Sequence, residues 1–201
     1  MPHRAVIERQ RRLFDDFFKV DEFFVAHEQI DGNMGAAQRQ LVFERGDAAA
    51  VLIFNTDRRA VVLVEQFRMP ALVGRRRDDP HTTNGWILET VAGMVDPEET
   101  PEAAAIRETR EETGYQPRRV QFIGKFFASP GGSSERFFLY FSEVSDADRI
   151  GKGGGVDGES IRIVHMPAED LFHRLAQGLI DDAKLYLAAC WLKSRLQSAT
   201  S

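Results

Sequence analysis

Apolar, β-prone runs of seven or eight residues occur four times in the first seventy positions of the chain. The β-prone runs 23–30 and 40–46 flank the turn-forming stretch "DGNMGAA" at 31–37. Strand-like runs on either side of Gly and Asn predict an antiparallel hairpin. A second pair of runs, 48–54 and 60–67, is joined by a short polar turn and predicts another strand pair.

The pattern changes between residues 74 and 114. Segment 74–85, "GRRRDDPHTTNG", is charged and turn-forming and predicts a surface loop, after which 86–94 returns to strand character. A helix over 101–113 is then predicted, because Thr100 is a favourable N-cap and Gly114 suits the position after the last helical residue. Three more strands are expected at 119–127, 135–144 and 160–166, and two helices from about 167 and 181.

Many strands around one central helix, with two helices at the C-terminus, predict an α+β class fold built as α/β/α layers. We expect the layered domain over 46–201 and an N-terminal β extension over 1–45. A hairpin cannot bury both of its faces alone. The extension should therefore pack on the main domain or on a second subunit.

Composition narrows the functional classes. The 201 residues carry 31 acidic and 26 basic side chains, a formal net charge of -5, which argues against nucleic acid or an anionic membrane as partner. Apolar runs fall short of the roughly 18 residues that span a bilayer. The single cysteine, Cys190, excludes an intrachain disulfide framework and fits a reducing compartment. We expect a cytoplasmic protein with a small-molecule ligand.

Three glutamates gather near the end of the predicted central helix. Glu108, Glu111 and Glu112 lie where the helix dipole disfavours negative charge, and their spacing places them on one face. Hard divalent cations prefer such oxygen ligands, and magnesium is commonly held by one or two carboxylates together with phosphates. The alternative is a solvated acidic face, partly neutralised by Arg107 and Arg110.

The whole segment 93–115, "GMVDPEETPEAAAIRETREETGY", resembles the Nudix box, the loop–helix–loop signature of the Nudix hydrolases. One semi-variable position departs from that pattern, because Thr109 stands where the family usually has an aliphatic residue or alanine. The fixed positions of the box are filled by Gly93, Glu99, Arg107, Glu108, Glu111, Glu112 and Gly114.

The resemblance implies the Nudix fold and metal-dependent chemistry, with Mg²⁺ or Mn²⁺ as cofactor. Nudix enzymes hydrolyse a nucleoside diphosphate linked to another group, and metals suit this reaction because they neutralise charge on phosphate oxygens and acidify a bound water. By resemblance, Glu108 and Glu112 are the principal metal ligands. Glu111 is a further ligand or a partner in activating water, and the Ala92 carbonyl is an additional ligand.

The remaining box positions have structural roles by the same resemblance. Arg107 and Glu99 should form an ion pair that braces the loop against the helix. Gly93 should supply a backbone geometry that a side chain would hinder, and Gly114 should follow the end of the helix.

Segments outside the box look like the ADP-ribose and GDP-mannose pyrophosphatases, which act on nucleoside diphosphate sugars. They are "EQFR" at 65–68, "WILETVAGM" at 86–94, "ASPGGSSER" at 128–136 and "IDDAKLYLAACWL" at 180–192. In that branch the residues at the positions of Arg68 and Glu89 contact or shape the substrate pocket, and the glycine turn offers Ser133, Ser134 and Glu135 as candidate contacts to the diphosphate or the terminal sugar. The implied substrate-binding residues are Arg68, Glu89, Ser133, Ser134 and Glu135.

The general base is expected outside the box. In related pyrophosphatases a loop after the helix delivers a glutamate, and here "GKGGGVDGESIRI" carries Glu159 and Asp157 beside a glycine-rich stretch. Glu159 is the first candidate and Asp157 the second. An acidic surface loop without a catalytic role is the alternative.

These features predict a Mg²⁺-dependent hydrolase that splits a nucleoside diphosphate sugar into a nucleoside monophosphate and a sugar 1-phosphate. ADP-ribose and GDP-mannose both remain open as substrates. Alternatives are a nucleoside triphosphate or dinucleotide pyrophosphohydrolase, and a regulator that binds a nucleotide sugar without cleaving it. By resemblance, we also expect a homodimer that exchanges the N-terminal region between subunits.

Overall fold

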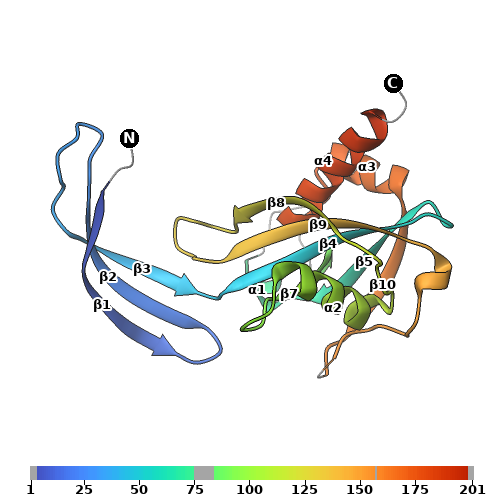
Figure 1. The fold of residues 1–201 in the computed structure, drawn as a ribbon, viewed down its shortest axis with the longest axis horizontal. Coiled ribbons are helices and arrows are strands. Elements are labelled where there is room, and N and C mark those ends of the chain that lie inside the picture. Colours follow the sequence, from blue (N-terminus) through green and yellow to red (C-terminus); the bar gives the residue numbers. More distant parts are fainter. Residues whose placement is uncertain (1–3, 75–83, 157, 199–201) are drawn as a thin grey trace. The chain divides into compact units, whose positions relative to one another are not determined.

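The computed structural model describes residues 4–74, 84–156 and 158–198. The chain forms two compact units, shown in the ribbon of Figure 1. The first consists of Met1–Asp47 and Phe126–Arg136, and the second of Ala48–Lys125 and Phe137–Ser201. Most of the charged insertion predicted at 74–85 lies outside the described residues, as does Asp157.

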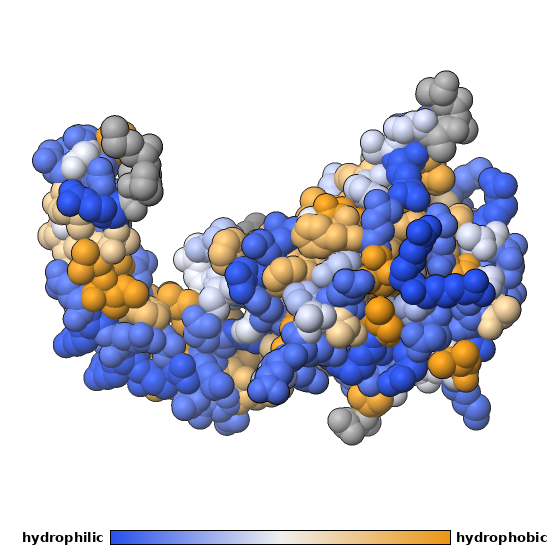
Figure 2. All heavy atoms as spheres, viewed as in Figure 1, coloured by the Kyte–Doolittle hydropathy of each residue, from blue (hydrophilic) through white to orange (hydrophobic). Residues whose placement is uncertain are grey.

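The first unit contains a three-stranded antiparallel sheet of β1 (Ala5–Asp15), β2 (Lys19–His27) and β3 (Gln38–Glu44). Pairing of β2 with β3 confirms the predicted hairpin. Strand β1 was not predicted, because it is exposed along its whole length and lacks the alternation of a half-buried strand. Figure 2 shows hydrophobic residues at the surface of this unit, several of them from β1.

Two buried carboxylates join the three strands of this sheet. Asp21 pairs with Arg12 on β1, and Glu22 accepts hydrogen bonds from Arg39 on β3 (2.6 Å) and Arg11 on β1 (3.2 Å). The hydrogen bond from Arg12 lowers the pKa of Asp21, and the hydrogen bond from Arg39 lowers the pKa of Glu22. Both acids are therefore neutralised within the sheet.

The second unit is built on a seven-stranded sheet of order β10-β5-β4-β9-β8, with β6 paired to β5 and β7 paired to β4. Segment 86–94, predicted as strand, breaks at Thr90, so that its halves pair with different strands. The strands are β4 (Asp47–Asn55), β5 (Ala60–Phe67), β6 (Trp86–Glu89), β7 (Val91–Met94), β8 (Gln121–Phe127), β9 (Arg136–Val144) and β10 (Ile161–Pro167).

Helices cover both faces of this sheet, which confirms the predicted layered α+β fold. Ala104 and Ala105 of the central helix pack into a core with alternate residues of β4 and β5, including Val51 and Val62. On the opposite face, Trp191 of the last helix contacts Phe141 of β9, with ring centroids 5.0 Å apart. The helices are α1 (Met69–Val73), α2 (Pro101–Thr113), α3 (Ala168–Gln177) and α4 (Ala183–Ser198), with a 3₁₀ turn η1 (Asp146–Asp148).

Across the residues described above, no helix combines the length and the apolar character needed to cross a lipid bilayer.

Candidate active site

Helix α2 is capped by Thr100 at its N-terminus and by Gly114 at its C-terminus. The Thr100 hydroxyl accepts the Ala103 N–H (3.2 Å), and Gly114 adopts a left-handed conformation (φ 75°) while its N–H bonds to the Arg110 carbonyl. Thr109, the departure from the Nudix pattern, is fully buried, and its hydroxyl donates to the Ala105 carbonyl (2.7 Å). The core thus accepts the threonine because its polar group is satisfied within the helix.

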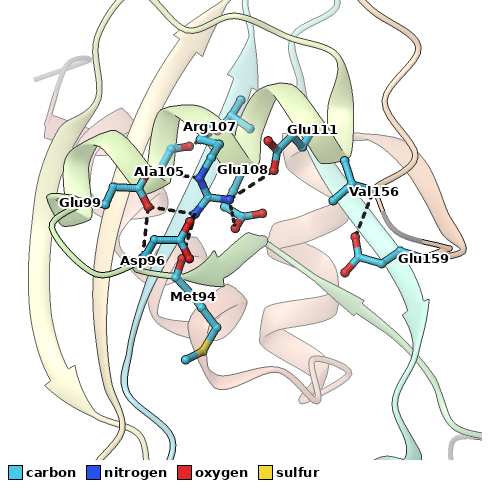
Figure 3. Close-up of polar contacts among 10 residues, drawn as sticks. Met94, Asp96, Glu99, Ala105, Arg107, Glu108, Glu111, Val156 and Glu159 are labelled. Atoms are coloured by element: carbon cyan, nitrogen blue, oxygen red, sulfur yellow. Dashed lines mark hydrogen bonds and ion pairs between the residues drawn. The ribbon is translucent and has the colours of Figure 1, made fainter. Parts of the chain in front are cut away.

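Arg107 fastens the preceding loop to α2, as Figure 3 shows. Its guanidinium donates to both carboxylate oxygens of Glu99, at 3.1 Å from Nε and 2.9 Å from Nη2, and Nη2 also donates to the Met94 carbonyl (2.9 Å). A two-pronged arginine–carboxylate pair fixes orientation as well as distance. Loop 94–99 is thereby held against one face of the helix.

The same guanidinium reaches toward the carboxylates of the next turns. Arg107 Nη1 lies 2.6 Å from Glu108 Oε1 and 3.2 Å from Glu111 Oε2. Burial nevertheless raises the pKa of Glu108 above its usual range, with Arg107 opposing the shift. One arginine is therefore shared among Glu99, Glu108, Glu111 and, at 3.8 Å, Asp96, and it does not neutralise the group.

Glu112 is the least satisfied of these acids. Its side chain is buried, and Oε2 has no hydrogen-bond partner among the residues that the structure describes. Burial raises the pKa of Glu112 to about 9, and the neighbouring charges of Glu108 and Glu159 add to the shift, while the Ala92 N–H and Arg68 oppose it. A buried carboxylate is stable only when a cation or donors compensate it.

Gly93 lies directly against Glu108. A Cβ atom at this position would stand 1.9 Å from Glu108 Oε1 and 2.0 Å from Glu108 Cδ. Only glycine therefore lets the carboxylate approach the backbone of β7. The same strand brings Ala92 to Glu112, so residues 92 and 93 meet the two glutamates of α2.

This donor set fits a divalent cation. It contains a buried carboxylate oxygen that no described residue hydrogen-bonds and a second carboxylate with a raised pKa, both against the β7 backbone. Within the described ranges, no group of three or more His, Cys, Asp or Glu side chains is arranged so that it could hold a metal ion. An open set of this kind suits magnesium, which keeps several water ligands and takes others from substrate phosphates.

Glu159 faces this group from the segment before β10. It raises the pKa of both Glu108 and Glu112, which places its charge near theirs. In this structure Glu159 Oε2 accepts the Val156 N–H (3.2 Å), so its carboxylate is held by its own loop, as drawn in Figure 3.

Arg68 and Glu89 contact each other in a buried polar network. Arg68 donates to Glu89 Oε2 from Nη2 (2.7 Å) and Nε (3.1 Å), and Gln66 donates to the same oxygen (3.2 Å). Lys184 at the start of α4 lies 3.8 Å from Glu89 Oε1 and 2.6 Å from Asp182 Oδ1. The Glu89 carboxylate is thus paired with the side chains of Arg68 and Lys184. The Arg68 side chain is 36% exposed, so part of it is accessible to a ligand.

Sequence reasoning had not singled out Lys184 or Asp182. The available signal was a lysine within the otherwise apolar "KLYLAACWL" stretch, two residues after an aspartate at an N-cap position. The Asp182 carboxylate accepts the Leu185 N–H (3.0 Å), as such caps do.

Ser133, Ser134 and Glu135 belong to the first unit and are engaged there. The Ser134 hydroxyl donates to Glu44 Oε2 (2.7 Å), and Ser133 Oγ lies 3.3 Å from the Phe43 carbonyl. Glu135 is buried and pairs with Arg45 at 3.2 Å.

Comparison with known proteins agrees with this geometry. The NUDIX domain model matches residues 44–188. Proteins described as GDP-mannose pyrophosphatases are similar over nearly the whole chain: one from Cronobacter sakazakii is 33% identical over 93% of this chain and 94% of its own length. Others from Klebsiella pneumoniae (34%; 96% and 94%) and Escherichia coli (30%; 96% and 97%) cover similar shares. This chain therefore belongs to the Nudix family.

Proposed function

We propose that the protein is a Mg²⁺-dependent pyrophosphatase that hydrolyses a nucleoside diphosphate sugar, with GDP-mannose as the leading substrate. Nudix hydrolases generally use divalent metal ions, and the similar bacterial proteins are described as GDP-mannose pyrophosphatases. The observation that carries the proposal is Oε2 of buried Glu112, which has no hydrogen-bond partner among the described residues and lies on the same helix face as Glu108. The products would be GMP and mannose 1-phosphate.

Glu108 and Glu112 would hold the metal, with the Ala92 carbonyl and Glu111 as further ligands. When bound, the metal supplies charge neutralisation at the diphosphate and lowers the pKa of the attacking water. Arg107 and Glu99 hold the loop against the helix that carries Glu108 and Glu112. Gly93 supports the same geometry by leaving room for the Glu108 carboxylate.

Glu159 would act as general base. Its carboxylate takes a proton from the water that attacks one phosphorus, while the bond from that phosphorus to the bridging oxygen breaks and the other phosphate leaves. Its charge near Glu108 and Glu112 supports this role. The carboxylate must first release the Val156 N–H that it accepts in this structure.

Arg68 would contact the diphosphate through the exposed part of its guanidinium, with Glu89 fixing its orientation. Ser133, Ser134 and Glu135 remain candidate substrate contacts, supported by the resemblance of their glycine turn to the nucleotide-sugar pyrophosphatases. We include a homodimer in the proposal, supported by the exposed hydrophobic side chains of the β1–β2–β3 sheet, such as Ile7 and Phe14.

The function is tested with a panel of GDP-mannose, ADP-ribose, other nucleotide sugars, dinucleoside polyphosphates and nucleoside triphosphates, each with Mg²⁺, and products identified by mass. We expect GMP and mannose 1-phosphate to form fastest. The change Glu159→Gln should lower kcat by about 100-fold or more, as loss of a general base does. No turnover of any nucleotide sugar, or preferred cleavage of triphosphates, would contradict the proposal.

A further inference from the structure

The glycine-rich segment before Glu159 is bound to the C-terminal end of α2. The Gly154 N–H donates to the Glu112 carbonyl (2.8 Å) and the Gly155 N–H to the Glu111 carbonyl (3.1 Å). Just before them, the Ile150 N–H donates to the Gly114 carbonyl (2.8 Å). The last carbonyls of a helix lack partners within it, so this segment supplies them.

Such close contact depends on glycine at position 153. Gly153 has a φ of +68°, and a Cβ there would lie 2.6 Å from the Glu112 carbonyl oxygen and 2.5 Å from the Thr113 carbonyl carbon. Both are backbone atoms of the helix, which cannot rotate aside as a side chain could. Any larger residue must therefore push the segment away from α2.

Gly155 has a second role, nearer to the base. A Cβ at this position would lie 2.6 Å from Glu159 Oε2 and 2.8 Å from Glu159 Cβ. The Glu159 side chain thus lies directly against the Gly155 backbone. Its position depends on the absence of a side chain at residue 155.

We infer that Gly153 and Gly155 are positioning residues for the reaction, which rests on the proposed role of Glu159 as base. The backbone carbonyls of Glu111 and Glu112 bind the segment, while the carboxylate of Glu112 belongs to the candidate metal site. The base-bearing segment and the metal-binding turn are therefore set in register by the same residues. A displacement of about 1 Å from productive geometry can cost about 100-fold in rate.

The first test compares Gly153→Ala with Gly178→Ala. Gly178, after α3, has nearly the same φ (+69°), but a Cβ there meets no described atom within 4 Å, so it reproduces the backbone strain without the collision. Gly153→Ala should lower kcat for GDP-mannose about 100-fold with KM changed less than about threefold, because register and not binding is lost. Gly178→Ala should keep wild-type kcat.

A double-mutant cycle separates positioning from general damage. In the Glu159→Gln background, adding Gly153→Ala should lower kcat by less than about threefold, because no base remains to be positioned. Thermal melting checks folding, and Gly155→Ala enters the same cycle if Gly153→Ala does not fold. The inference is overturned if Gly153→Ala and Gly155→Ala both keep the wild-type kcat, or if Gly153→Ala lowers kcat equally with and without the Glu159 carboxylate. Neither result would contradict the role of Glu159 as base. Normal turnover of Glu159→Gln alone removes the base and the inference with it.

Discussion

Two groups of buried acids in this molecule have opposite electrostatic character. In the β1–β2–β3 sheet, Asp21 and Glu22 are paired with arginines and their pKa values are lowered. On α2, Glu112 is buried and Glu108 is half-buried, the pKa values of both are raised, and one oxygen of Glu112 has no partner in the described chain.

We interpret the paired acids of the sheet as structural and the acids of α2 as functional. Charged side chains taken out of water need compensation, and the sheet supplies it from its own arginines. Helix α2 leaves compensation incomplete, because Arg107 is shared by four acids, Asp96, Glu99, Glu108 and Glu111. A site that keeps an uncompensated carboxylate is suited to an external cation.

The largest expected effect follows from Glu112→Gln. Activity should fall about 1000-fold, because metal stabilisation of the transition state amounts to several kcal/mol and each ~1.4 kcal/mol is a factor of ten. Stability without metal should not fall, since an amide resembles the protonated carboxyl that a pKa of about 9 implies at neutral pH. Turnover assays measure activity, and urea unfolding in the presence of a chelator measures stability without metal. A strong loss of stability would mean that Glu112 has a structural role and not a metal-binding one.

Arg107→Lys should have the next largest effect. A lysine cannot hold both oxygens of Glu99 and the Met94 carbonyl in fixed geometry, so the ligand oxygens should lose their orientation. We expect activity to fall by about 10- to 100-fold, as losses of supporting contacts around metal ligands do. Arg110→Lys, on the exposed side of the same helix, is the control, and equal losses in both variants would contradict the role given to Arg107.

Glu22→Gln tests the structural role of a paired acid in the β1–β2–β3 sheet. It should lower the melting temperature at neutral pH, because Arg39, Arg11 and Arg9 would then face each other without the carboxylate, while kcat stays unchanged. Since the pKa of Glu22 is lowered in the folded protein, its contribution is present above the unfolded value of about 4.3 and is lost as pH falls through the folded value.

The gap in melting temperature between wild type and Glu22→Gln should therefore close in acid. Glu8→Gln, exposed on β1, serves as control and should melt like the wild type. A gap that persists at low pH would mean that packing and not charge holds Glu22.

The smallest effect concerns His165, whose ring contacts the Tyr115 hydroxyl at 3.1 Å. Burial lowers the pKa of His165, and Arg58 and Arg149 add to the shift while Asp146 opposes it. The unfolded chain binds the proton more readily, so stability should decline as pH falls below about 6.5. Melting curves of His165→Gln should show a weaker decline over that range, and an identical slope would exclude this histidine as its source.

Local chemistry explains which parts of the fold could be predicted from the sequence. The bounds of α2 follow from Thr100, Pro101 and Gly114, which act on neighbouring backbone groups, and the prediction of 101–113 is confirmed. Strand β1 pairs with the neighbouring β2 but is exposed along its whole length, so it lacks the apolar alternation that marks a strand. The break at Thr90 depends on pairing with strands from two other parts of the chain, β5 and β4, which no neighbouring residue signals.

Some features of the candidate site could likewise be predicted from the sequence, and others could not. The spacing of Glu108, Glu111 and Glu112 is visible in the sequence because it needs only helix geometry. The partners of Glu89 are not visible, since Gln66 and Lys184 reach it from separate elements. Nor does the sequence reveal that one Glu112 oxygen has no hydrogen-bond partner among the described residues. That property depends on the positions of donors from many separate elements.

The most direct test of the central claim is a titration of Mn²⁺, as a paramagnetic substitute for Mg²⁺, into the wild type, Glu112→Gln and Glu22→Gln, with bound ion followed by electron paramagnetic resonance. Our account predicts saturable binding to the wild type and to Glu22→Gln, and binding at least about tenfold weaker to Glu112→Gln. Equal binding by wild type and Glu112→Gln would show that the acids of α2 do not hold the metal.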